Sequence, residues 1–124
     1  MEINAITHEV IGSSIKIHRC FGPGMLESAY EKCLVYEMVK RGFHVEHQVV
    51  LPLIYDGITI DAGYRLDLRI SRLVIVEVKA IEVVLPIHKA QLLCYMRLSG
   101  CRMGLIINFN AVRLVDGITR MIFD

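Results

Sequence analysis

The sequence lacks any apolar run long enough to cross a membrane, although 54% of its 124 residues are hydrophobic. The longest uncharged apolar stretches, such as Val83–Ile87, fall far short of the roughly 20 residues that a membrane-spanning helix needs. The N-terminus, which begins Met-Glu-Ile-Asn-Ala-Ile, has neither a basic leader nor the apolar core of a signal peptide. We therefore expect a soluble, cytoplasmic protein without a membrane partner.

Cysteine pairs of the kind that bind zinc are also absent. The four cysteines, Cys20, Cys33, Cys94 and Cys101, form no CxxC pair, and none has a histidine at the short spacing of zinc fingers. We interpret them as reduced thiols, because free cysteine behaves as a small buried hydrophobe.

An excess of one charge is lacking too. Fourteen Lys and Arg residues face thirteen Asp and Glu residues, which leaves a net charge of +1 and is weak evidence for a nucleic-acid partner. If Glu27, Asp67, Glu77 and Lys79 belong to a metal site, the rest of the chain carries thirteen positive and ten negative charges. That balance of +3 is compatible with phosphate contacts without requiring them.

The length suits one hydrophobic core, so we expect a single domain over residues 1–124. Apolar residues at helical spacing predict helices at about 4–18, 25–41 and 86–98. Alternation predicts strands at about 43–49, 58–60, 64–70 and 73–79, and further strands at 103–107 and 112–123. Pro52 indicates a free edge near the first strand, and Asp56-Gly57 is a turn signal. The expected class is α/β (α+β), with helices flanking a central mixed sheet.

Two of the expected strands carry charged residues in alternation with apolar ones. If Asp67 lies opposite Glu77, the apolar residues of both strands share one face, where Leu66 meets Val78, Leu68 meets Val76 and Ile70 meets Val74. A slip of one residue would mix the faces and bury a charge. Packing therefore favours the register that brings Asp67 and Glu77 together, with a three-residue turn at 71–73.

Clustered carboxylates are unfavourable unless something offsets their charge, and Arg65 would likewise lie opposite Lys79. Mg²⁺ or Mn²⁺ would do so, since both are hard cations that bind carboxylate, carbonyl and water oxygens. The alternative is a solvated face on which arginine pairs with aspartate and lysine with glutamate, and the two strands alone favour neither. Glu27 lies in the first turn of its helix, where compensation of the helix dipole is a sufficient explanation.

The spacing of Asp67, Glu77 and Lys79, which is Asp-x9-Glu-x-Lys, resembles the signature of the PD-(D/E)xK, or restriction-endonuclease-like, nuclease superfamily. Leu66 stands where the name of the superfamily has proline. The segment Gly24-Met-Leu-Glu-Ser-Ala-Tyr30 resembles the hallmark of the GxxExxY proteins, a small family placed in that superfamily. Segments that begin at 77, 86 and 104 are similar to later motifs of the same family, so the resemblance covers almost the whole chain.

The resemblance implies a restriction-endonuclease-like core, with elements in the order ααβββ(β)αββ, and a magnesium or manganese site. Its ligands would be Glu27, Asp67, Glu77 and the backbone carbonyl of Val78. The metal would polarise the scissile phosphate and lower the pKa of a bound water, while Lys79 would orient that water or stabilise charge on phosphorus. The resemblance also makes Gln91 a catalytic, site-facing residue.

Further residues have both a supporting and a plainly structural interpretation. Tyr30 is more simply a core aromatic whose hydroxyl supports Glu27, and His88 a residue of the first turn of its helix. Tyr95 is either a partly buried aromatic or a hydrogen-bond donor behind the site, and it shares a helix face with Gln91, four residues before it. Asn108 and Asn110 flank an expected turn, which favours a structural role.

Two functions of different classes are compatible with these features. The first is a metal-dependent nuclease, a hydrolase that cleaves phosphodiester bonds in DNA or RNA. The second is a catalytically idle module that keeps the nuclease fold and binds nucleic acid or another protein, since a fold does not establish an activity. A homodimer is compatible with either function. The clustered carboxylates favour the enzyme, because a module without catalysis has no need for them.

Overall fold

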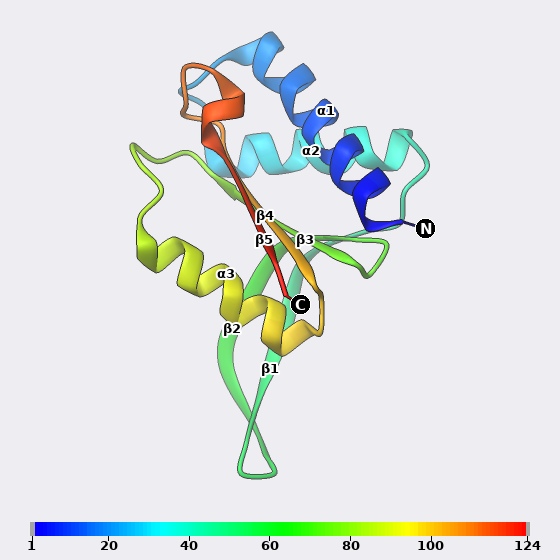
Figure 1. Cartoon of the computed structure of the whole chain (residues 1–124), viewed down its shortest axis with the longest axis vertical. Coiled ribbons are helices and arrows are strands. Elements are labelled where there is room, and N and C mark those ends of the chain that lie inside the picture. The colour runs from blue at the N-terminus through cyan, green and yellow to red at the C-terminus, as the bar shows by residue number, and fades with distance from the viewer. Residues whose placement is uncertain (1, 124) are drawn as a thin grey trace.

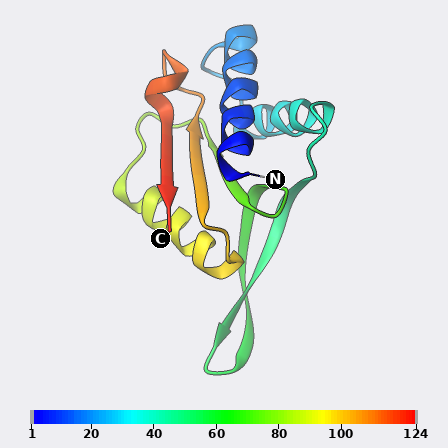
Figure 2. The same ribbon diagram turned by 45° about the vertical axis from the view of Figure 1, so that its right-hand side comes forward.

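The computed structural model describes residues 2–123 (Figures 1 and 2), so Met1 and Asp124, the ends of the expected domain, lie outside the described residues. Its elements are α1 (Ile3–Phe21), α2 (Glu27–Lys40), β1 (Val45–Tyr55), β2 (Ile58–Ile70), β3 (Val74–Lys79), α3 (Pro86–Ser99), β4 (Met103–Asn108), the 3-10 helix η1 (Leu114–Gly117) and β5 (Ile118–Ile122). The strands form one sheet in the order β1-β2-β3-β4-β5, in which only β3 and β4 are parallel. The expected mixed α+β architecture is confirmed.

Helices cover both faces of the sheet. Helices α1 and α2 pack on one face, where the core includes Ile6, Val10, Tyr30, Leu34, Val76 and Leu105. Helix α3 packs on the other face, where the core includes Leu66, Ile75, Leu92, Tyr95, Met96 and Ile106. The alternation along β4 explains this division, because successive side chains of a strand point to opposite faces. Among residues 2–123, no helix combines the length and apolar content that a membrane span requires.

Helix α3 has the expected boundaries, since Pro86 begins it and Gly100 follows its last residue in a left-handed conformation with φ of 75°. The helix approaches the sheet closely over Gly104. A Cβ atom at this position would lie 2.8 Å from the sulfur of Met96 and 2.9 Å from a methyl carbon of Leu92. The glycine therefore allows α3, which carries several candidate site residues, to lie against β4.

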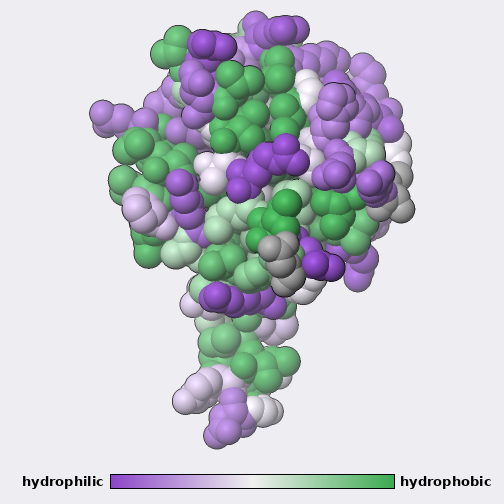
Figure 3. Space-filling view, viewed as in Figure 1, coloured by the Kyte–Doolittle hydropathy of each residue, from purple (hydrophilic) through white to green (hydrophobic). Residues whose placement is uncertain are grey.

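Strands β1 and β2 form a hairpin arm, which we define as residues 50–64, that projects from the body away from α1 and α2 (Figures 1, 2 and 3). Asp56 and Gly57, with φ of 52° and 75°, make the predicted turn, and β1 is the edge strand that Pro52 indicated. The expected separate strand at 58–60 was wrong, because β2 continues through it to Ile70. The N–H of Gly63 donates to the carboxylate of Asp61. The strand continues past this local hydrogen bond.

The last expected strand, at 112–123, was also too long. Helix η1 occupies the start of this segment and places Leu114 in the core beneath α1 and α2, and only Ile118–Ile122 pairs with β4. The N–H of Asp116 donates to the carbonyl of Arg113 at 3.0 Å, which closes a helical turn where alternation predicted an extended chain.

Candidate active site at a fork in the sheet

The hairpin between β2 and β3 has the predicted register. Its connection is the three-residue turn Ser71–Leu73, in which Ser71 and Arg72 have positive φ and the N–H of Leu73 donates to the carbonyl of Ile70 at 2.9 Å. The paired residues are Leu68 with Val76, Arg69 with Ile75, and Ile70 with Val74. The same register, continued by one residue, sets Asp67 beside Glu77.

The ladder between β2 and β3 ends at Leu68 and Val76, and beyond them the two strands separate into a fork. Opposite this point, Gln48 of β1 has a positive φ of 51° and interrupts the pairing of β1 with β2. The prediction that Leu66 shares a face with Leu68 was therefore wrong. Leu66 is buried on the α3 face and Leu68 on the face of α1 and α2, and the ladder of β2 with β3 ends between them.

Asp67 and Glu77 face each other across this fork, which confirms that they are neighbours. The carboxylate of Asp67 accepts the N–H of Val78 through Oδ2 at 2.8 Å, and the carboxylate of Glu77 accepts the N–H of Asp67 through Oε2 at 2.8 Å. Each side chain thus binds the backbone of the opposite strand where the regular ladder has stopped, and these bonds hold both carboxylates in place.

Helix α2 brings a third carboxylate to the end of β3. Glu27, its first residue, is exposed, and its Oε2 accepts the N–H of Ala80 at 3.0 Å. Tyr30 fixes the loop that precedes this helix, because its hydroxyl donates to the carbonyl of Gly22 and accepts the N–H of Met25. Tyr30 is the expected core aromatic, but its hydroxyl supports the loop and makes no bond to Glu27.

The ring of Tyr30 stacks on Phe109, with ring centroids 4.3 Å apart. Phe109 follows β4 directly, and its N–H donates to the carbonyl of Lys79 at 2.9 Å. The aromatic pair therefore connects the start of α2 to the end of β3, the two segments that carry Glu27 and Lys79.

A fourth carboxylate, Glu31, escaped the sequence-based prediction. Both of its oxygens accept the side-chain amide of Gln48, at 3.0 and 2.9 Å, and its charge raises the pKa values of Asp67 and Glu77. Glu31 lies one helical turn after Glu27, so the spacing of four residues was the available signal. Gln48 thereby joins α2 to the strand irregularity that opens the fork.

Burial determines the electrostatics of the fork. Burial, and then the charge of Asp67, raises the pKa of Glu77 to about 8. Burial also raises the pKa of Asp67 to about 6, against the lowering effects of the Val78 hydrogen bond and of Lys79. None of the ion pairs within 4 Å among residues 2–123 includes Asp67, Glu77 or Lys79. The protein thus holds one buried and one half-buried carboxylate, Glu77 and Asp67, without a cationic partner in contact.

The donor set at the fork fits a hard divalent cation in its chemistry, since it consists of oxygens. Val78 adds to it: its N–H points toward Asp67, and the carbonyl of a strand residue lies on the same side as its N–H. In the described part of the chain, however, no group of three or more His, Cys, Asp and Glu side chains is arranged to hold a metal ion. Asp67, Glu77 and Glu27 each use one carboxylate oxygen in a bond to a backbone N–H.

A pocket of about 530 Å³ adjoins the fork between α3, β2 and β3. Its lining includes Lys79, Gln91, Tyr95, His88 and Tyr64, so it brings together most of the remaining residues that the sequence singled out. Gln91 and Tyr95 share one face of α3, as their spacing predicted. His88 also has a structural role, because its Nδ1 accepts the N–H of Leu85 at 2.8 Å and caps the helix.

Asn108 has the structural role that was favoured. Its side chain accepts the N–H of Ile81 and donates to the carbonyl of the same residue, at 3.1 and 3.0 Å. The carbonyl oxygen of its side chain also accepts the N–H of Asn110 at 3.2 Å. These bonds tie the segment after Lys79 to the end of β4 and so fix the exit of the chain from the site.

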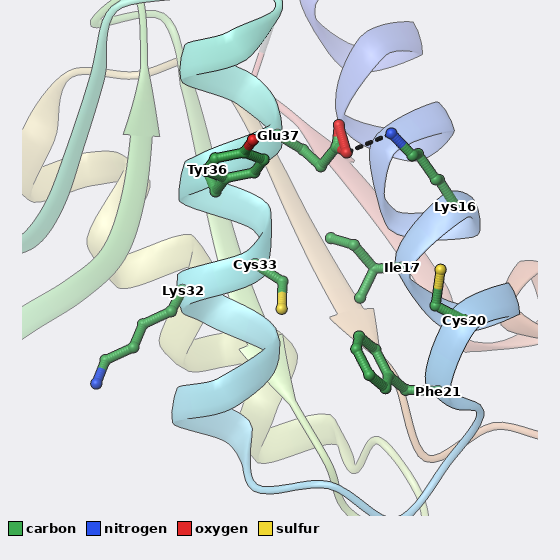
Figure 4. Close-up of a pocket in the computed structure, with 8 residues that line it drawn as sticks. All are labelled: Lys16, Ile17, Cys20, Phe21, Lys32, Cys33, Tyr36 and Glu37. Atoms are coloured by element: carbon green, nitrogen blue, oxygen red, sulfur yellow. Dashed lines mark hydrogen bonds and ion pairs between the residues drawn. The ribbon is translucent and has the colours of Figure 1, made fainter.

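A second cavity, of about 320 Å³, lies between α1 and α2 (Figure 4). Ile17, Phe21, Cys33 and Tyr36 make most of its wall apolar, and it shares no lining residue with the pocket beside the fork. Cys33 and the other three cysteines are free thiols.

Comparison with known families gives a match over almost the whole chain. The model of the PD-(D/E)XK nuclease superfamily matches residues 4–121, a range that includes the whole fork and helix α3. Neither the comparison with curated proteins nor that with solved structures gave a significant match.

Proposed function

The chain belongs to the PD-(D/E)XK nuclease superfamily, and on that premise we propose that it is a nuclease that hydrolyses phosphodiester bonds of DNA or RNA. The observation that carries the proposal is the pair of carboxylates at the fork, buried Glu77 and half-buried Asp67, with Lys79 nearby and no cation in contact. The motif from Gly24 to Tyr30 supports the narrower assignment to the GxxExxY proteins, which is part of the proposal.

Nucleases of this superfamily generally use divalent metals, and we propose Mg²⁺ or Mn²⁺ here. Glu27, Asp67, Glu77 and the carbonyl of Val78 would hold the ion, since each contributes an oxygen at or beside the fork. When bound, the ion would polarise the scissile phosphate and lower the pKa of an attacking water. The raised pKa values of Asp67 and Glu77 support this proposal, because two neighbouring carboxylates that are largely removed from water are costly without a cation.

Lys79 and Gln91 complete the proposed machinery. Lys79 is half-buried at the end of β3 and lines the pocket, where its ammonium group would orient the attacking water or stabilise charge on the phosphate. Gln91 is exposed on α3 in the same pocket, and among residues 2–123 its side chain makes no hydrogen bond, so its amide is free to orient a substrate.

One observation favours the second function, a binding module without turnover. Among residues 2–123, no group of three or more His, Cys, Asp and Glu side chains is arranged to hold a metal ion. A module would retain nucleic-acid binding in the pocket and gain nothing from metal.

Titration calorimetry with Mg²⁺ and Mn²⁺ separates the two functions. The wild-type protein should bind the ion, and an ion at 100 times its Kd should add about 2.7 kcal/mol to the free energy of unfolding and raise the melting temperature. Asp67→Ala should abolish both effects. Asp61→Ala is the matched control, because Asp61 is an exposed aspartate of the same strand and should leave binding unchanged. An equal metal response in wild type and Asp67→Ala would refute the metal site.

A nuclease assay with Mn²⁺ on single-stranded and double-stranded substrates tests the role of Lys79. Glu77→Ala should abolish metal binding and cleavage together. Lys79→Ala should lower the turnover roughly a hundredfold while metal affinity stays equal or rises, since a nearby positive charge disfavours the ion. Lys89→Ala, at an exposed lysine of α3, is the control. Full activity of Lys79→Ala would remove Lys79 from the proposal.

A further inference from the structure

The pocket beside the fork has an aromatic wall that the proposed chemistry does not use. Tyr64 of β2 and Tyr95 of α3 meet there edge to face, with ring centroids 6.2 Å apart and ring planes at 66°. Tyr95 is buried, with 6% of its surface exposed, whereas Tyr64 is 39% exposed. Packing therefore fixes one ring of the pair, and the other stands at the mouth of the pocket.

This aromatic wall lies close to the carboxylates. Lys79 comes two residues after Glu77 on β3, so the pocket that it lines begins beside the carboxylates. Lys79 and Gln91 line the same pocket as the two tyrosines. A ligand group that enters the pocket therefore lies beside Lys79, a residue of the proposed reaction centre.

The pocket has the size and chemistry of a site for a flat, partly polar group. Its volume of about 530 Å³ exceeds what one or two water molecules need, and apart from Lys79 and His88 its wall is uncharged. Aromatic rings bind nucleobases by stacking, which tolerates every base because each has a π-face. The free amide of Gln91 offers one donor group and one acceptor to a base edge.

We infer that this pocket binds an unpaired nucleobase next to the scissile phosphate, so that the substrate is single-stranded nucleic acid or a locally unpaired nucleotide. The inference rests on the proposed nuclease function and specifies its substrate class. A base can enter only after it has left its stack, and entry of a paired base costs unstacking and unpairing energy.

The charge of the chain supports the same substrate. Affinity for duplex backbones comes mainly from lysine and arginine contacts with phosphates, and this chain has a net charge of only +1. The arm beside the pocket carries Asp56 and Asp61 and no lysine or arginine over residues 50–64. Stacking therefore supplies affinity that phosphate contacts here do not.

The test measures binding of short single-stranded oligonucleotides that carry 2-aminopurine, with EDTA and separately with Ca²⁺, by anisotropy and by the fluorescence of the base analogue. Stacking on a tyrosine should quench that fluorescence at one position of the oligonucleotide. Tyr64→Leu keeps an apolar side chain suited to a strand but removes the ring. It should weaken binding by roughly fivefold to a hundredfold and abolish the quenching. Tyr64→Phe should restore both.

Tyr55→Ala is the matched control, since Tyr55 is an exposed tyrosine of the same arm that lines no part of the pocket. It should bind as the wild type does. A duplex of the same sequence should bind more weakly than the single strand, and an abasic residue at the quenched position should weaken single-strand binding as much as Tyr64→Leu does.

The outcomes separate the inference from the nuclease function. If the wild type cleaves nucleic acid but Tyr64→Leu binds and cleaves as well as Tyr55→Ala, the inference is overturned and the nuclease remains. If the wild type quenches 2-aminopurine through Tyr64 yet cleaves nothing with any metal, base binding in the pocket is supported and the nuclease function is refuted. If no oligonucleotide binds, both are overturned.

Discussion

Two buried glutamates of this protein have opposite surroundings. Glu37 and Glu77 expose 7% and 5% of their surfaces. Glu37 of α2 accepts a hydrogen bond from Lys16 of α1 at 2.6 Å (Figure 4), and Arg41 lies 3.9 Å away. The hydrogen bond from Lys16 is the main cause that lowers the pKa of Glu37, whereas burial raises the pKa of Glu77 to about 8.

The difference distinguishes a structural acid from a candidate ligand. At Glu37 the chain supplies its own cations, so the charge helps to hold α1 against α2. At Glu77 the nearest partners are the N–H of Asp67 and another carboxylate, so the folded chain carries a strain that a cation from solution would relieve. An unfavourable electrostatic free energy of this kind is typical of functional sites, where it is retained because function requires it.

The largest expected difference between the two glutamates is in catalysis. Glu77→Gln keeps the shape and the acceptor oxygen but removes the charge, and in a Mn²⁺ nuclease assay it should lower activity by at least about a hundredfold. Glu37→Gln, assayed well below its melting temperature, should retain wild-type activity. An equal loss in both variants would indicate that the effect arises from stability rather than from the site.

The next difference is in the pH dependence of stability without metal. The pKa of Glu77 is raised from its ordinary value of 4.5, so the unfolded chain releases this proton first as the pH rises. Stability should therefore fall between about pH 4.5 and pH 8, with a slope of up to about 1.4 kcal/mol per pH unit from this group. Urea unfolding at a series of pH values measures it.

Glu77→Gln should flatten this slope and make the metal-free protein more stable than the wild type at pH 8. Glu37 contributes with the opposite sign, because its lowered pKa gives stability that is present above pH 4.5 and is lost as the pH falls below it. A wild-type slope between about pH 6 and pH 8 that survives Glu77→Gln would contradict the electrostatic account of the fork, because Asp67 contributes only below about pH 6.

The sequence predicted much of the site because local patterns determine it. Alternation in β2 and β3 fixed the register of Asp67 and Glu77, and Pro86 and Gly100 marked both ends of α3. These features depend on a strand's two-residue period and on backbone preferences, which neighbouring residues report directly.

The rest depends on contacts between distant segments. Leu66 and Leu68 lie on opposite faces where the ladder of β2 with β3 ends, and nothing in the local sequence of β2 indicates that end. To predict the contribution of Glu31, one must know which side of α2 faces β1. To predict the contact of Tyr64 with Tyr95, one must know the position of the arm relative to α3. The extension of β2 was missed because Asp61 and Gly63 are residue types common in turns, whereas here the strand continues through them.

The smallest expected effect is on the stability of the helix pair. Glu37→Gln removes the charge that accepts from Lys16, and because the Lys16 side chain is 52% exposed, the loss should be only about 1 kcal/mol at pH 7. Lys16→Met should cost a similar amount, and the double variant should cost less than the sum of both, since the two residues share one interaction. Urea unfolding of the four proteins measures this coupling, and strict additivity would show that the pair does not join α1 to α2.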